Sequence, residues 1–130
     1  MSLPTPPRAV ETAYGRILIY PDEIIALHLN DDLPITLTVA QQMVTDVQAQ
    51  SPSDAIHLLL LQGANSDLTF EAQRYFASVT GFARVAFVMR SRLQVEVGQF
   101  LARFLQALKT SYEFKPFYDV DAAMAWLQSP

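Results

Sequence analysis

The heptapeptide IHLLLLQ, residues 56–62, carries four consecutive leucines, so any strand it forms presents apolar side chains to both faces of a sheet. A strand that is apolar on both faces is typical of the centre of a parallel sheet, where helices cover it. Pro52 and Ser53 precede the heptapeptide and Gly63 follows it, and these residue types end regular structure. The stretch therefore predicts a central parallel strand in an α/β domain.

Strand and helix signals alternate on either side of this central strand. Further strands are predicted at residues 14–20, 24–29, 84–89 and 113–118. Helices are predicted to follow the N-cap residues Thr38, Thr69, Ser91 and Asp119. The order ββαβαβαβα predicts an α/β fold with a mostly parallel five-stranded sheet, an N-terminal antiparallel hairpin and four helices. Pro116 predicts that the last strand lies at an edge, because proline cannot donate to a central ladder.

Length and composition fit a single domain. Prolines at positions 4, 6 and 7 predict a flexible tail over residues 1–12, which leaves residues 13–130 as the domain. Hydrophobic residues make up 51% of the chain and charged residues only 17%, which predicts a relatively apolar surface. Cysteine is absent, and neither a secretory signal nor a bilayer-length apolar run is visible, so we expect a cytoplasmic protein without a transmembrane segment. The net charge of -4 argues against nucleic acid as the partner.

Three stretches resemble a known protein family. They are LTFEAQRYFAS at residues 68–78, ARVAFV at residues 83–88, and FYD at residues 117–119 followed by AAMAWL at residues 122–127. Together with the element order, they resemble an uncharacterised bacterial branch of the STAS-like domains, whose fold is that of the sporulation anti-anti-sigma factors. The resemblance implies a regulatory, anti-sigma factor antagonist-like role that works through protein–protein contacts.

The resemblance also implies a site of phosphorylation. Regulatory STAS proteins carry a phosphorylated Ser or Thr at the start of the second helix, in an Asp-Ser-Ser-Gly-like motif. The matching segment here is Asn65-Ser66-Asp67-Leu68-Thr69, which lacks the Ser-Gly pair. Ser66 and Thr69 are therefore the candidate phosphorylated residues.

Other polar positions carry weaker signals. Arg90, Ser91 and Arg92 precede a predicted helix, where backbone N–H groups and two guanidinium groups could bind an anion; a capped helix with two solvated arginines is the alternative. Asn30-Asp31-Asp32 fits a polar turn better than a cation site, because its spacing matches no EF-hand loop. His28 and His57 are predicted to be structural. No catalytic or cofactor-binding motif is present, so we expect a non-enzymatic domain with no metal and no cofactor.

The predicted third helix is apolar over about twice the width of an ordinary inward face. One apolar row consists of Leu93, Val97, Phe100, Phe104 and Leu108. The other row consists of Val95, Gly98, Leu101, Ala102 and Leu105. One row can pack on the sheet, and we expect the second row to form an interface with a protein partner or a second copy of the chain; cover by other parts of the same chain is the alternative. The alternative function is a carrier or sensor that binds a small apolar or lipid-like ligand.

Overall fold

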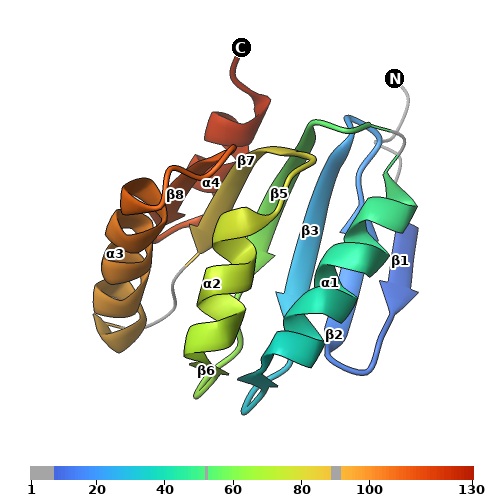
Figure 1. Ribbon diagram of the computed structural model, residues 1–130. Helices are drawn as coiled ribbons and strands as arrows, with labels where there is room; N and C mark the ends of the chain where they lie inside the picture. Colours follow the sequence, from blue (N-terminus) through green and yellow to red (C-terminus); the bar gives the residue numbers. More distant parts are fainter. Residues whose placement is uncertain (1–7, 52, 89–91) are drawn as a thin grey trace.

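The computed structural model describes residues 8–51, 53–88 and 92–130, and within 92–98 it describes the backbone but not the side chains. It has an α/β fold with four helices and a six-stranded sheet (Figure 1). In spatial order the sheet consists of β1 (Arg8–Glu11), β2 (Gly15–Ile19), β3 (Ile24–Leu29), β5 (Ile56–Leu61), β7 (Phe82–Val88) and β8 (Glu113–Phe117). The helices are α1 (Leu37–Gln50), α2 (Phe70–Ser78), α3 (Arg92–Ala107) and α4 (Val120–Gln128).

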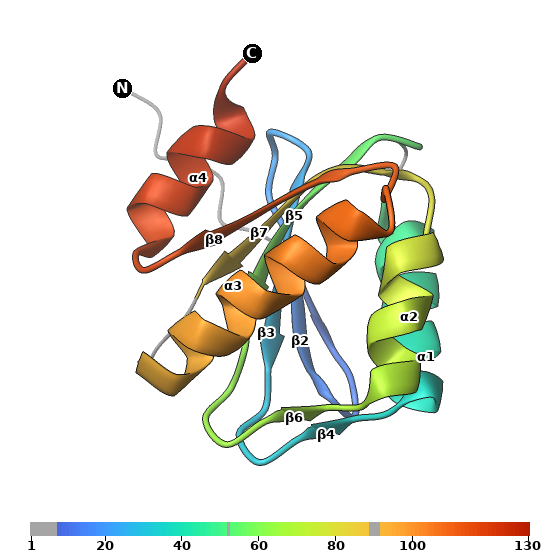
Figure 2. The same cartoon turned by 60° about the vertical axis from the view of Figure 1, so that its left-hand side comes forward.

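Strand order decides which face each helix covers. Strands β3, β5, β7 and β8 are parallel, and they lie side by side in the order in which they follow one another in the chain. Right-handed crossovers in one direction place the connecting helices on one face. Figure 2 shows α1 and α2 on one side of the sheet and α4 on the other. Leu101 and Leu105 of α3 reach the face that α1 and α2 cover, so three helices share one face.

The leucine run of β5 supplies both hydrophobic cores. Leu58 pairs with Ile25 and Val85 and belongs to the core beneath α1 and α2. Leu59 points to the opposite face and belongs to the core beneath α4. Because β5 lies between β3 and β7 and is parallel to both, the prediction of a central, doubly covered strand is confirmed.

The prediction of five strands is wrong, because β1 lies in the segment that was expected to be a tail. Residues 8–11 pair antiparallel with β2, and Val10 stands opposite Ile17. Val10 also packs against the core, which stabilises a strand that has only one neighbour. The prolines that predicted the tail end at position 7, so nothing in residues 8–11 opposes a strand.

A second, two-stranded sheet joins the starts of α1 and α2. Its strands, β4 (Pro34–Ile35) and β6 (Asp67–Leu68), are parallel and lie beside the lower ends of both helices in Figure 1. Each strand leads into an N-cap threonine. Thr36 accepts a hydrogen bond from the Val39 N–H at 3.3 Å, so the cap of α1 lies two residues before the predicted Thr38. Thr69 caps α2 as predicted, accepting from the Ala72 N–H at 3.2 Å.

Within the described residues, none of the helices combines the length and the apolar character that crossing a bilayer demands.

Candidate functional site

Helix α3 buries the apolar row that was predicted to form an interface. Leu101 and Leu105, which were expected in an exposed interface, are 6% and 1% exposed and lie in the core. Ala102 is half-buried, and the side-chain positions of Val95 and Gly98 lie outside the described part of α3. Both rows of the helix are apolar, so periodicity alone could not select the inward one. The row that contains Leu101 and Leu105 packs toward Phe87 and Phe114 on the sheet. The row that contains the two phenylalanines of α3 therefore faces outward.

The outward side of α3 and the start of α2 form an aromatic surface, defined here as the exposed Phe70 and Phe100 together with the half-buried Phe104 between them. Phe70 is 59% exposed and Phe100 is 57% exposed. The rings of Phe100 and Phe104 are nearly parallel, with centroids 6.4 Å apart. Phe70 approaches Phe104 from α2, with centroids 6.1 Å apart. The three rings are thus a connected group that links two helices, rather than scattered apolar side chains.

Charged side chains accompany the aromatic surface. The Arg74 guanidinium lies 5.9 Å from the centroid of the Phe70 ring, a distance suited to a cation–π interaction. Glu71 and Arg103 are neighbours in sequence of Phe70 and Phe104, and both are exposed. Aromatic residues, phenylalanine included, and arginine are enriched in protein interfaces relative to the rest of the surface. The arrangement therefore has the composition of a protein-binding surface.

Sequence inspection could have found Phe70 but not the whole aromatic surface. The inward row of α2 follows helical spacing through Ala72, Phe76 and Val79, and Phe70 falls outside that row. On α3, in contrast, both rows are apolar at helical spacing, and only the packing of the helix on the sheet decides which row is buried.

The two candidate phosphorylated residues lie directly before the aromatic surface. Ser66 lies in the loop before β6 and donates a hydrogen bond to the Gly63 carbonyl oxygen at 3.0 Å. Thr69 is the N-cap residue of α2 and immediately precedes Phe70. Both residues are half-buried, and both hydroxyl groups are engaged in local hydrogen bonds. Ser66 thus lies in a loop and Thr69 at a helix start, but both are half-buried where exposed positions were expected, and their phosphorylation stays a prediction.

The structure describes the candidate cation site at residues 30–32 but not the whole of the candidate anion site at residues 90–92. Arg90 and Ser91 lie outside the described residues, and for Arg92 the structure describes only its place as the first residue of α3, so that site stays a prediction. Asp31 accepts a hydrogen bond from the Ala64 N–H at 2.8 Å, and the Asp32 N–H donates to the Ala64 carbonyl oxygen at 2.7 Å. The polar turn at residues 30–32 thus holds the loop that follows β5.

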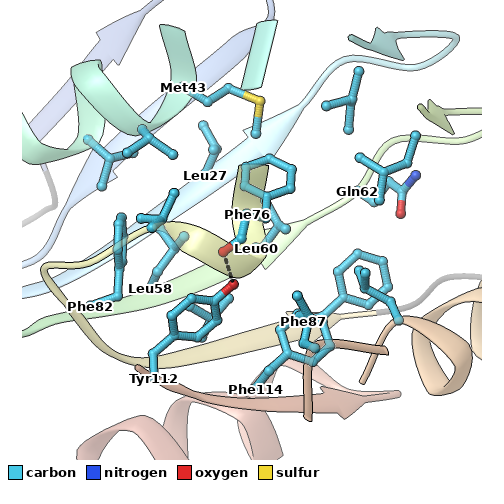
Figure 3. A pocket seen from close by; sticks show the side chains of 18 of the residues that line it. Leu27, Met43, Leu58, Leu60, Gln62, Phe76, Phe82, Phe87, Tyr112 and Phe114 are labelled. Carbon is cyan, nitrogen blue, oxygen red and sulfur yellow. Dashed lines mark hydrogen bonds between the residues drawn. The ribbon is translucent and has the colours of Figure 1, made fainter. Parts of the chain in front are cut away.

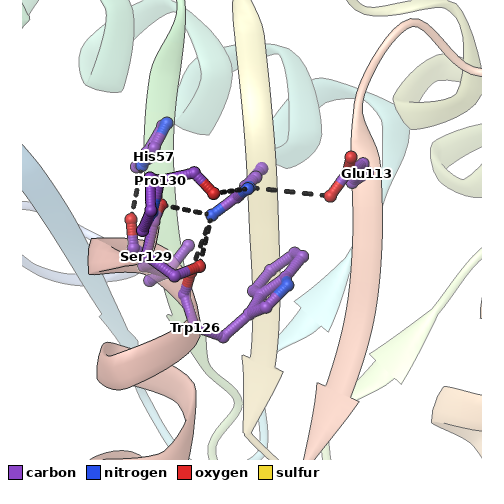
Figure 4. A network of polar contacts seen from close by, with 7 residues as sticks. His57, Glu113, Trp126, Ser129 and Pro130 are labelled. Atoms are coloured by element: carbon purple, nitrogen blue, oxygen red, sulfur yellow. Dashed lines mark hydrogen bonds and ion pairs between the residues drawn. The ribbon is translucent and has the colours of Figure 1, made fainter.

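A polar network lies on the face that α4 covers, around Arg84, whose partners Glu113, Trp126 and Ser129 are labelled in Figure 4. Arg84 donates to the carbonyl oxygens of Trp126 and Ser129, each at 2.8 Å, and pairs with Glu113 at 3.6 Å. His57 donates from Nδ1 to the Leu127 carbonyl oxygen at 2.7 Å, so this histidine is structural, as predicted. These carbonyl groups end α4, where a helix leaves acceptors without intrahelical partners. The network therefore anchors α4 on the sheet.

His28 lies half-buried on β3.

Two tyrosines have perturbed acidity for structural reasons. Burial raises the pKa of Tyr14 above its ordinary value, and the neighbouring Asp46 carboxylate, which accepts its hydroxyl hydrogen bond at 2.8 Å, raises it further. Burial also raises the pKa of Tyr112, whose hydroxyl donates to the Phe76 carbonyl oxygen at 2.7 Å. A raised pKa keeps both phenols neutral, so these groups act as hydrogen-bond donors within the fold.

Comparison with known proteins identifies a family. No curated protein and no solved structure matches the chain. One family does match, over residues 17–130. This range begins inside β2 and includes all four helices and the aromatic surface, whereas β1 lies before it. Because the match extends over most of the 130 residues, the chain belongs to the DUF7793 family, a domain of unknown function.

Proposed function

We propose that this protein is a non-enzymatic, STAS-like regulatory domain that acts through protein–protein contact, and that a second copy of the chain binds its aromatic surface. The STAS resemblance of residues 68–78, 83–88 and 117–127 supports the regulatory role. The α/β fold with an antiparallel start, a mostly parallel sheet and four helices is compatible with that resemblance. The single observation that carries the proposed contact is the connected aromatic group on α2 and α3, in which Phe70 and Phe100 are exposed.

Energetics favour a partner on this surface. Burying a phenylalanine side chain fully contributes about 1.5–3 kcal/mol, and Phe70 and Phe100 are both more than half exposed. Ring packing across Phe104 already limits the motion of both side chains, so less entropy is lost when a partner orders them. The surface thus offers binding free energy at a low ordering cost.

The charges around the aromatic surface favour a second copy as the partner. Glu71 carries a negative charge, whereas Arg74 and Arg103 carry positive charges. In a two-fold interface the same surface is used twice, so opposite charges on one surface can pair with each other across the axis. An apolar centre with a charged rim is also the usual anatomy of an interface.

Sedimentation equilibrium tests this function. We expect the wild type to be a dimer at micromolar concentration and the double variant Phe70→Ser, Phe100→Ser to be a monomer with an unchanged circular dichroism spectrum. Leu37→Ser is the matched control, because Leu37 is also an exposed apolar residue at a helix start, 38% exposed, but lies outside the aromatic surface. A wild type that stays monomeric at high micromolar concentration would rule out the second copy.

Phosphorylation of Ser66 or Thr69 is the regulatory step that we propose on the same resemblance. Thr69 adjoins Phe70, so a phosphate there would bring about -1.5 to -2 charges to the margin of the aromatic surface. A phosphate is also favoured electrostatically at the N-terminus of α2. Phosphorylation would therefore alter the interface while leaving the helix intact.

A further inference from the structure

An open groove of about 480 Å³ lies along β8, the edge strand of the sheet that has β7 as its neighbour. Residues 113–115 all line it. Consecutive side chains of a strand point to opposite faces, so the groove follows the free edge of β8 rather than one face of the sheet. Figure 2 shows β8 between α3 and α4, and both helices contribute to the lining. Ligand pockets are usually about 300–1,000 Å³ in volume, so this groove has room for a small molecule.

Apolar and aromatic side chains from three elements line the groove. Leu105 comes from α3, Phe114 from β8 and Trp126 from α4. Tyr112 lines it too, but its hydroxyl donates to the Phe76 carbonyl oxygen at 2.7 Å, beside a cavity of about 80 Å³ between the sheet and α1, α2 and α3 (Figure 3). Tyr112 therefore offers its ring rather than its hydroxyl to a ligand in the groove. Aromatic side chains in such number favour a ligand that has a ring of its own.

Both lysines of the chain, Lys109 and Lys115, line the groove. Neither lysine pairs with a carboxylate among the side chains that the structure describes. Glu113 is the acidic residue of the lining, and Arg84 pairs with it at 3.6 Å. The groove thus concentrates positive charge in a chain whose net charge is -4. This charge favours an anion as the ligand.

The two lysines come from different elements, and each has a separate structural setting. A lysine on an edge strand also deters pairing with other strands, so Lys115 alone carries no argument. Lys109 follows the last residue of α3 and has a φ of 55°. Glycine is the usual residue at such a position, because a side chain makes this conformation costly. The chain therefore carries a lysine beside the groove in spite of that cost.

We propose that this groove binds a small organic anion that carries one aromatic ring, such as an aromatic carboxylate. The ring packs among the apolar and aromatic side chains, and the flexible stems of the two lysines bring their ammonium groups to the carboxylate. Because the groove is open to solvent, each ion pair contributes little, and binding is weakened by salt. None of the three phenylalanines of the aromatic surface lines the groove, so this site is independent of the self-association proposed above.

Fluorescence of Trp126 provides the measurement, because it is the only tryptophan and lines the groove. Three probes separate the contributions of ring and charge. Hydrocinnamate carries both, hydrocinnamamide carries the ring alone, and inorganic phosphate carries charge alone. We expect a saturable change with hydrocinnamate, about tenfold weaker binding of the amide, and no saturable change with phosphate over the same concentrations. Raising the ionic strength should weaken the binding of hydrocinnamate but not that of the amide.

Substitutions of exposed residues test the role of charge with little risk to the fold. Lys109→Gln with Lys115→Gln should weaken hydrocinnamate binding about tenfold, whereas Lys109→Arg with Lys115→Arg keeps the charge and should bind like the wild type. Arg103→Gln is the control, because Arg103 is an exposed cation of α3 outside the lining. Gln106→Glu places a carboxylate in the groove and should weaken binding, while Gln99→Glu makes the same change outside the lining and should not.

Each element of the proposal has an outcome that overturns it. Absence of a saturable response to hydrocinnamate overturns the site. Equal affinities for hydrocinnamate and its amide, or an unchanged affinity in Lys109→Gln with Lys115→Gln, overturn the role of charge. Phosphate binding as tight as that of hydrocinnamate overturns the role of the ring and indicates an adventitious ion only. The variant Phe70→Ser, Phe100→Ser should bind hydrocinnamate like the wild type, so loss of self-association and loss of this site are measured separately.

Discussion

Phe100 and Leu101 are neighbours in the sequence, yet one side chain of α3 is exposed and the other is buried. Phe100 is 57% exposed and stacks on Phe104, whereas Leu101 is 6% exposed and lines the cavity above the sheet. The helix therefore has two apolar sides with different roles. Its inner side belongs to the core, and its outer side belongs to the proposed interface.

This orientation predicts that equivalent leucine substitutions differ in their cost. Leu105→Ala should lower the free energy of unfolding by about 2–5 kcal/mol, because Leu105 is only 1% exposed and its loss opens a void. Leu108→Ala should change it by no more than about 0.5 kcal/mol, because Leu108 is 50% exposed. Urea denaturation of the two variants measures both values. Equal losses would mean that the helix is not turned as described.

The Arg84 network predicts a loss of α4 docking when the guanidinium is removed. Arg84→Met keeps most of the side-chain stem but removes the donors to Trp126 and Ser129, so it should cost about 2–3 kcal/mol. Trp126 is the only tryptophan, and the Arg84 guanidinium lies 5.3 Å from its ring centroid, so its fluorescence should change as α4 loosens. Arg16→Met is the control, because the Arg16–Glu11 pair is exposed and should contribute less than about 1 kcal/mol. Unchanged fluorescence and stability in Arg84→Met would refute the anchoring role.

Position 63, at the end of β5, has no room for a side chain. A Cβ atom there would overlap the Asn30 carbonyl oxygen and lie 2.7 Å from the Asp31 backbone nitrogen. Gly63→Ala should therefore destabilise the chain by about 1–3 kcal/mol, since backbone atoms cannot move aside cheaply. Ala64→Ser, at the exposed next position, should be nearly neutral. Thermal unfolding compares the two variants, and a Gly63→Ala protein as stable as the wild type would contradict the close approach of the two loops.

A charged substitution at Thr69 should change the affinity of self-association without changing the stability of the fold. Thr69→Asp should leave stability within about 0.5 kcal/mol, because aspartate caps a helix as well as threonine does. The added charge beside Phe70 should weaken self-association about tenfold, which corresponds to about 1.4 kcal/mol. Thr69→Asn, which caps without a charge, should associate like the wild type. An unchanged dimer affinity in Thr69→Asp would argue against regulation at this position.

The two buried tyrosines predict a loss of stability at alkaline pH. Both have a folded-state pKa above the unfolded value of 10.0, so their neutral forms stabilise the fold up to about that pH. Above it the unfolded chain loses these protons first, and the free energy of unfolding should fall as the pH rises. The fall should be smaller in the double variant Tyr14→Phe, Tyr112→Phe. Tyr118→Phe, at a site that is 71% exposed, should behave like the wild type. The prediction fails if the double variant and the wild type lose stability equally.

Local signals in the sequence were sufficient for most of the elements. The strand at residues 24–29 has the predicted bounds, and the leucine run forms the central strand because both of its faces are apolar. Thr69 and Asp119 begin α2 and α4 as predicted, because a short polar side chain that can bond a free N–H marks a helix start without help from distant residues. Where two such residues lie close together, at Thr36 and Thr38, the sequence alone selected the wrong one.

The candidate sites depended on contacts between distant segments. Phe70 and Phe104 lie far apart in the sequence, and only the packing of α2 beside α3 brings their ring centroids to 6.1 Å from each other. Strand β1 likewise needed β2 and the core beside it before four residues could hold an extended conformation. The sequence by itself determined the four helices and five of the six strands of the main sheet, because periodicity and capping are local. Only the tertiary structure decided which apolar side of α3 is buried, because that choice depends on how the helix crosses from β7 to β8 and on which side chains fit the sheet beneath it.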